Sequence, residues 1–152
     1  MQVRPITRAF LALILLLMAA CDPGIAIRQF HPKAGNGASL GVAIRVRTIN
    51  SMIGTTHYAP EVEIANSSDS PIYVTSVELA SQGTVFQNKP QRPGTYPLEV
   101  PPGRTETLDI WFRLANDVKK TFRKPAELRV YYRSGDKQQI ARTSLMGGSL
   151  SP

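Results

Sequence analysis

The sequence predicts an all-β protein, an antiparallel β-sandwich of about seven to eight short strands. Apolar and polar residues alternate in several runs between residues 40 and 145, and a period of two is typical of strands with one buried face. The 12 prolines and 11 glycines separate these runs, where an all-β fold needs turns. No stretch after residue 21 keeps a helical period for three turns, and only one short helical turn is expected, within 115–124.

The predicted domain covers residues 40–145, and its strands follow from where apolar residues alternate with polar ones. We expect them near 40–47, 60–66, 72–80, 84–87, 98–100, 108–114, 128–133 and 138–145. Turns are expected at 67–71, 101–103 and 134–136, where Ser, Asp, Pro and Gly cluster. The apolar parity changes between Val74 and Val77, which predicts a β-bulge or an edge that serves both faces. The tail at 146–152 is expected to be disordered.

Composition and charge limit the classes of protein that the chain can belong to. A chain of 152 residues that is 42% hydrophobic and 19% charged is globular, and its single cysteine excludes an internal disulfide. The net charge of +7 falls by two, to +5, if Arg4 and Arg8 are removed with a leader. This mild excess favours anionic surfaces such as phospholipid head groups. No nucleic-acid-binding motif is present, so nucleic acid is not a predicted partner.

Residues 1–20 have the architecture of a signal peptide. Arg4 and Arg8 precede an unbroken apolar run from Ala9 to Ala20. As a helix this run would rise only about 18 Å, whereas a bilayer core needs about 30 Å. A leader that is removed is therefore favoured over a permanent transmembrane helix.

The segment Leu17-Met18-Ala19-Ala20-Cys21 resembles the lipobox of bacterial lipoproteins. The usual pattern has Leu three residues before the cysteine, where this chain has Met18. The resemblance implies that the signal is cut before Cys21, whose sulfur receives diacylglycerol and whose amino group is acylated. Two or three acyl chains make a stable membrane anchor. The alternative is an ordinary secretory signal cut after Ala20.

The resemblance also predicts where the protein resides. It implies a lipid-anchored protein of the cell envelope, on the periplasmic face of the inner or the outer membrane. Asp22 resembles the signal that retains lipoproteins of enteric bacteria in the inner membrane. Residues 21–39 are expected to form a flexible tether, and a coil of this length spans about 25 Å. Alternatively, Ile25, Ile27 and Phe30 belong to a short first strand.

The predicted domain resembles immunoglobulin-like domains of periplasmic and surface proteins. The resemblance rests on the runs EIANSSDSPIYVTSVELAS and LEVPPGRTETLDIWFRL and covers most of residues 40–145. It is a likeness of pattern, and the cysteine pair of antibody domains is absent.

The sequence gives no sign of an enzyme. Only His31 and His57 could act as histidine bases, the single thiol of Cys21 is used for lipid, and no GxSxG motif occurs. Glu61, Glu63, Glu78 and Glu99 lie on strands or turns as ordinary outward charges. We therefore predict a non-enzymatic protein without a cofactor.

The sequence leaves a metal site open as an alternative. His57 follows Met52 by five residues in one loop, and Met146 lies far away in the sequence. Thioether and imidazole ligands suit copper. The alternative function is therefore a periplasmic module that binds a small ligand or copper. An exposed loop histidine explains the same residues without any metal.

A basic loop is the predicted contact with anionic lipid. Lys119, Lys120, Arg123 and Lys124 surround Phe122, and each cation near an anionic leaflet contributes about 1 kcal/mol. The alternative is a solvated loop that is basic for solubility.

A protein-docking face is predicted from the two most regular strands. If 108–114 and 128–133 pair as a hairpin, one sheet face combines six residues of types enriched at interfaces or able to pair across strands. These residues are Asp109, Trp111, Arg113, Arg129, Tyr131 and Arg133. The alternative is an ordinary hydrated sheet face. The leading functional prediction is a membrane-anchored envelope lipoprotein that binds a protein partner or helps to assemble an envelope complex.

Overall fold

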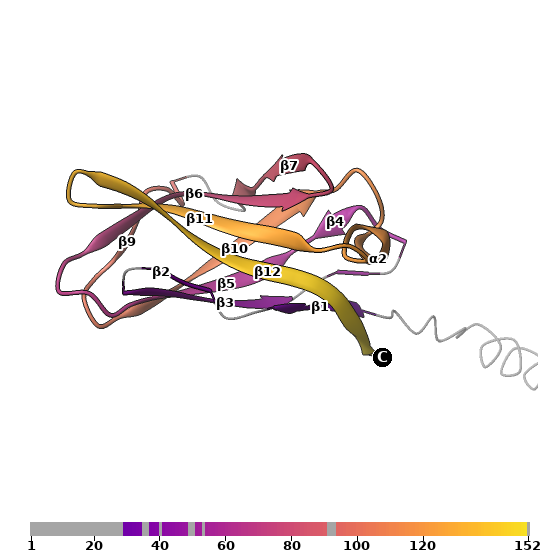
Figure 1. Ribbon diagram of the computed structural model, residues 1–152, viewed down its shortest axis with the longest axis horizontal. Coiled ribbons are helices and arrows are strands. Elements are labelled where there is room, and N and C mark those ends of the chain that lie inside the picture. The colour runs from indigo at the N-terminus through magenta and orange to yellow at the C-terminus, as the bar shows by residue number, and fades with distance from the viewer. Residues whose placement is uncertain are drawn as a thin grey trace, which may run out of the picture.

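Two antiparallel β-sheets pack face to face in the computed structural model (Figure 1), which describes residues 29–34, 37–39, 41–48, 51–52, 54–90 and 94–151. The predicted fold class, an all-β sandwich, is confirmed. One sheet, called here the β11 sheet, has the order β1–β12–β11–β6–β7, with β9 beside β6. The other, called the β10 sheet, has the order β2–β3–β5–β10–β4, with β8 beside β10.

The strand bounds follow the predicted alternation closely in the middle of the chain. The β11 sheet consists of β1 (Gln29–Ala34), β12 (Lys137–Ser151), β11 (Ala126–Ser134), β6 (Ile72–Ser81), β7 (Thr84–Gln87) and β9 (Leu98–Val100). The β10 sheet consists of β2 (Gly37–Ser39), β3 (Val42–Thr48), β5 (Pro60–Asn66), β10 (Thr105–Arg113), β4 (His57–Tyr58) and β8 (Lys89–Pro90). The one described helix is α2 (Val118–Thr121), at the position of the predicted helical turn.

The core lies between the two sheets and is built by the period of two. Along β5, buried residues alternate strictly with half-buried ones, so Val62 and Ile64 point inward. Leu128 and Val130 of β11 belong to the same core from the other sheet and are also fully buried. Each such side chain contributes about 1.5–3 kcal/mol of hydrophobic stabilisation.

The predicted β-bulge is confirmed and lies at Thr75. Ser76 pairs with Tyr131 but Val74 pairs with Tyr132, so Thr75 is an extra residue in β6. The Thr75 hydroxyl donates a hydrogen bond to the Tyr131 carbonyl oxygen at 3.2 Å. The bulge explains why the apolar parity of this strand changes between Val74 and Val77.

The ends of the predicted domain were placed wrongly, because two segments without clear alternation pair with each other. The predicted tether includes β1 and β2, and the predicted disordered tail forms the second half of β12. Phe30 pairs with Leu150 and Lys33 with Met146. Phe30 therefore belongs to a first strand, whereas Ile25 and Ile27 lie outside the described residues.

A close approach between the two sheets requires a glycine in β2. A Cβ atom on Gly37 would collide with the Arg142 carbonyl oxygen and lie 2.9 Å from the Thr143 Cβ. Beside it, the Tyr132 hydroxyl of β11 donates to the Ser39 carbonyl oxygen of β2 at 3.1 Å. These contacts join the two sheets along one edge of the sandwich.

Candidate functional site

The predicted docking face is split between opposite sides of the molecule. Strand β10 pairs with β5, β4 and β8, whereas β11 pairs with β6 and β12, so the two strands do not form a hairpin. The prediction of one continuous face was therefore wrong. Its residues divide into Asp109, Trp111 and Arg113 on the β10 sheet and Arg129, Tyr131 and Arg133 on the β11 sheet.

The split arises because the chain between β10 and β11 crosses from one sheet to the other. This crossing contains α2, whose N-terminus is capped by the Asp117 carboxylate, which accepts a hydrogen bond from the Lys120 backbone N–H at 2.8 Å. Val118 and Phe122 are fully buried and close the end of the core. A segment with two buried side chains cannot act as the tight turn of a hairpin.

On the β10 sheet, Trp111 borders a shallow apolar hollow. It is half-buried, and its ring lies 5.6 Å from the ring of His57, tilted by 44°. The hollow has a volume of about 430 Å³ and is also lined by Met52, Thr55 and Ala59. We call these five residues the Trp111 hollow.

Local contacts explain how the residues of the Trp111 hollow are brought together. Strand β4 continues the register of β5 against β10, so Tyr58 pairs with Phe112 and His57 with Arg113. The Thr55 hydroxyl and backbone N–H both donate to the Met52 carbonyl oxygen, at 2.9 and 3.3 Å. This tight turn returns the chain, so that Met52, 39% exposed, lies at the same hollow as His57.

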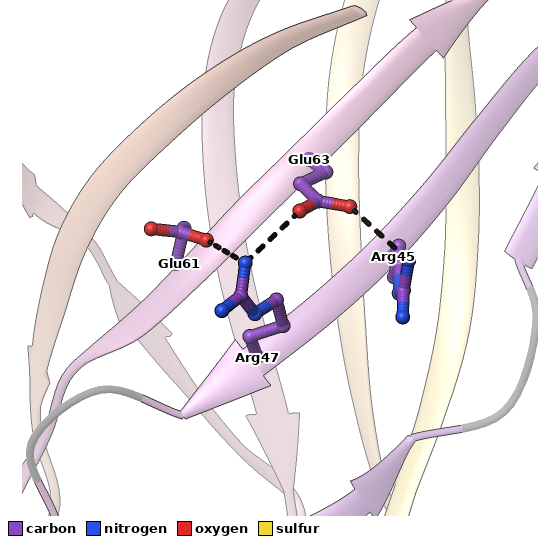
Figure 2. A network of polar contacts seen from close by, with 4 residues as sticks. All are labelled: Arg45, Arg47, Glu61 and Glu63. Atoms are coloured by element: carbon purple, nitrogen blue, oxygen red, sulfur yellow. Dashed lines mark hydrogen bonds and ion pairs between the residues drawn. The ribbon is translucent and has the colours of Figure 1, made fainter.

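Beside the hollow, the same sheet carries a network of ion pairs across β3 and β5 (Figure 2). Arg47 contacts Glu61 at 3.1 Å and Glu63 at 3.4 Å, and Arg45 lies 3.9 Å from Glu63. The two carboxylates are outward charges, as predicted, and each is paired with an arginine on the neighbouring strand. Because both arginine side chains are well exposed, the network contributes little to stability, about 0–1 kcal/mol per pair.

On the β11 sheet, the other half of the predicted face is occupied by contacts within the sheet. The Tyr131 hydroxyl donates to the Glu78 carboxylate at 2.8 Å, which raises the pKa of Tyr131. The Gln87 side-chain amide donates to the same carboxylate at 2.6 Å. Arg129 Nε donates to Glu127 Oε1 at 2.6 Å. These side chains already have partners, so this face is less available to a ligand than the Trp111 hollow.

The four cations of the basic loop are exposed, as predicted, but Phe122 is not. Lys119, Lys120, Arg123 and Lys124 are exposed, but Phe122 is fully buried and packs edge-on against Tyr58 at 4.8 Å. The predicted lipid contact of Phe122 was therefore wrong. The cause is that Phe122 ends α2 and fills the core between the two sheets.

Within the described part of the chain, no group of three or more His, Cys, Asp or Glu residues is arranged to hold a metal ion. His31 lies on β1, far in sequence from His57 on β4. Cys21 and Asp22 lie outside the described residues. Sequence reasoning identified Trp111 and His57 separately but missed their proximity, which depends on the register of β4.

Comparison with known proteins found no matching family model and no matching curated sequence.

Proposed function

We propose that this chain is a membrane-anchored envelope lipoprotein whose β-sandwich is a non-enzymatic module that binds or assembles protein partners. The observation that carries the proposal is the Trp111 hollow. The half-buried Trp111 lies on the β10 sheet beside Met52, with Arg113 and Asp109 on the same strand face. Trp, Met and Arg are enriched at protein interfaces, and a preformed apolar hollow suits one protruding side chain of a partner.

The anchor is proposed to be lipid on Cys21. The resemblance of residues 17–21 to a lipobox supports it, because the chain has no other cysteine. No helix in the described ranges is both long and apolar enough to cross a bilayer. Mass spectrometry of the peptide that begins at Cys21, and palmitate labelling of cells, test the anchor. A free thiol at position 21 would contradict it.

The docking site is tested by site-specific photo-crosslinking in the envelope. A photoreactive residue is placed at Arg113, next to the Trp111 hollow, or at Arg133 on the opposite sheet, since both arginines are exposed. We expect a discrete crosslinked product from position 113 that disappears with Trp111→Ala. Equal products from both positions, or a product that is insensitive to Trp111→Ala, would show that the hollow is not the docking site.

A second candidate function is the binding of Cu(I). The Met52 thioether and the His57 imidazole belong to side chains that line the same hollow, and Trp111 is 5.6 Å from His57 between ring centres. Soft thioether and imidazole ligands favour Cu(I), and an aromatic ring attracts a cation over its face. We expect purified full-length chain to retain copper after dialysis under reducing conditions, and His57→Ala to lose it while His31→Ala does not. Absence of retained copper in the parent protein would remove this function.

A further inference from the structure

The end of the sandwich that contains α2 presents a concentration of positive charge. Lys119, Lys120, Arg123 and Lys124 are all exposed. The exposed Lys33 of β1 is at the same end, because it pairs with Met146, the neighbour of Gly147, whose backbone N–H bonds to the Phe122 carbonyl oxygen. Asp117 is the only acidic residue within 115–125, and it lies 3.9 Å from Lys120. Within the described ranges, the other four cations make no ion pair.

These cations are held on a rigid surface. Phe122 and Val118 are fully buried, and the Ser81 hydroxyl donates to the Thr121 carbonyl oxygen at 3.3 Å. The backbone N–H of Gly147 donates to the Phe122 carbonyl oxygen at 2.8 Å, which joins β12 to the basic loop. The backbone that carries the basic side chains of the loop is therefore joined to both β6 and β12.

The same end of the molecule receives the N-terminal segment. Gln29, the first described residue, pairs with Ser151 at the far end of β12. Figure 1 shows β1 and the C-terminal end of β12 at the end of the sandwich that contains α2. Between Cys21 and Gln29 a polypeptide can extend at most about 28 Å. A lipid on Cys21 would therefore keep the basic end near the bilayer surface.

The opposite end of the sandwich differs in charge. Its connecting turns, 66–71, 101–104 and 134–137, carry Asp69 and Asp136 but also Arg104 and Lys137, so the charges balance. An anionic surface near the molecule would attract the α2 end and not this one.

We propose that the α2 end docks on the anionic phospholipid head groups of the membrane that holds the lipid anchor, with the long axis of the sandwich directed away from the bilayer. The inference rests on the proposed anchor at Cys21 and adds the orientation of the domain. Met146 is 53% exposed and pairs with Lys33, so an apolar side chain accompanies the cations. The Trp111 hollow lies beside this end, because the Val118 backbone N–H of α2 donates to the carbonyl oxygen of Thr55, which lines the hollow, at 2.9 Å, so a partner in the hollow would be held close to the membrane surface.

Lysine acetylation of the full-length chain on vesicles tests the proposal, with Lys137 as an internal control at the distant end. The chain is added to preformed vesicles of phosphatidylcholine alone or of phosphatidylcholine with phosphatidylglycerol, and each lysine is followed by mass spectrometry. On anionic vesicles we expect acetylation of Lys33, Lys119, Lys120 and Lys124 to slow about tenfold, because several cations at a charged surface keep that end docked. Protection should disappear in 1 M salt, where the Debye length is about 3 Å.

A charge-reversal variant assigns the protection to the basic loop. In Lys119→Glu/Lys120→Glu/Arg123→Glu/Lys124→Glu, Lys33 should lose its protection, whereas Arg104→Glu/Lys137→Glu at the other end should keep it. Equal acetylation on both kinds of vesicle, or a protected Lys33 in the fourfold variant, would overturn the docking proposal. The mass of the Cys21 peptide from the same sample reports on the anchor separately, so the two proposals can fail independently.

Discussion

The two ends of the sandwich are closed by different interactions. At the end opposite α2, the closure is a set of hydrogen bonds centred on the buried Asn66 side chain. Its amide nitrogen donates to the carbonyl oxygens of Ser70 and Val100, at 2.8 and 2.9 Å. Its amide oxygen accepts from the Ser68 backbone N–H at 3.0 Å and from the Ser68 hydroxyl at 2.6 Å. Every hydrogen-bonding position of this buried amide is used.

At the α2 end, the closure is apolar. Phe122 packs edge-on against Tyr58 at 4.8 Å, and Tyr58 stacks on Phe112 at 6.2 Å. The charged side chains of the same loop point outward. The comparison shows that aromatic packing can close one end of a sandwich while leaving its surface free to carry cations, whereas the hydrogen-bonded end uses its polar groups internally.

The largest expected effect on stability comes from removing the Phe122 ring, which closes the α2 end of the core. Phe122→Ala should lower the free energy of unfolding by about 4 kcal/mol, because truncation of a buried phenylalanine costs transfer energy and leaves a cavity. Chemical denaturation of the full-length chain measures this. Val85→Ala is the control, since Val85 is 47% exposed and should lose little. A loss below 1 kcal/mol for Phe122→Ala would mean that this end is not closed by Phe122.

A slightly smaller effect is expected at the hydrogen-bonded end. Asn66→Ala should lower the free energy of unfolding by about 3 kcal/mol, because the buried Val100 carbonyl oxygen and the part-buried Ser68 backbone N–H lose their hydrogen bonds to Asn66. Thermal unfolding monitored by circular dichroism tests it, with the exposed Ser70→Ala as the control, since only the backbone of Ser70 is used. If Asn66→Ala were as stable as Ser70→Ala, the hydrogen bonds of Asn66 would not be what closes this end of the sandwich.

The sequence predicted the position and the buried face of individual strands. Alternation placed β3, β5, β6, β10 and β11 because apolar side chains at every second position record which face is buried. The parity change in β6 placed a bulge, or an edge serving both faces, between Val74 and Val77, and the pairing with β11 shows the bulge at Thr75. These features are local, so one stretch of sequence contains the information.

Features that depend on distant partners were not predictable in this way. The sheet to which β10 and β11 each belong depends on pairing, and nothing in either strand specifies it. The end of β12 that pairs with β1 is rich in Gly and Ser and has no clear alternation of apolar and polar residues. Its own sequence therefore does not predict that it forms a strand with β1. Phe122 was misplaced because its four basic neighbours make the loop look exposed. The Trp111 hollow was missed because the register of β4 brings His57 to Trp111.

The smallest expected effect is that of Tyr58→Phe at the α2 end. This substitution distinguishes the contribution of the aromatic ring to stability from that of the hydroxyl group. The Tyr58 side chain is fully buried and its hydroxyl makes no hydrogen bond of good geometry among the described residues. Burial raises the pKa of Tyr58, and the Thr48 side chain opposes this shift with a smaller effect. Tyr58→Phe keeps the aromatic packing and removes an unsatisfied polar group. It should therefore raise the free energy of unfolding at pH 7 by about 1 kcal/mol.

The same variant should change the alkaline limb of the stability profile. Because the pKa of Tyr58 is raised in the folded state, its contribution is complete below pH 10.0, the ordinary tyrosine pKa, and is lost as the pH rises above that value. Tyr58→Phe should therefore lose less stability than the parent above pH 10.0. Part of the alkaline loss should persist, because burial also raises the pKa of Tyr96 to about 12. Denaturation series from pH 7 to about pH 11 measure both effects. Identical alkaline limbs for the two proteins would mean that the Tyr58 hydroxyl reaches solvent or a partner in the folded state, and that the α2 end is less completely apolar than its ring contacts indicate.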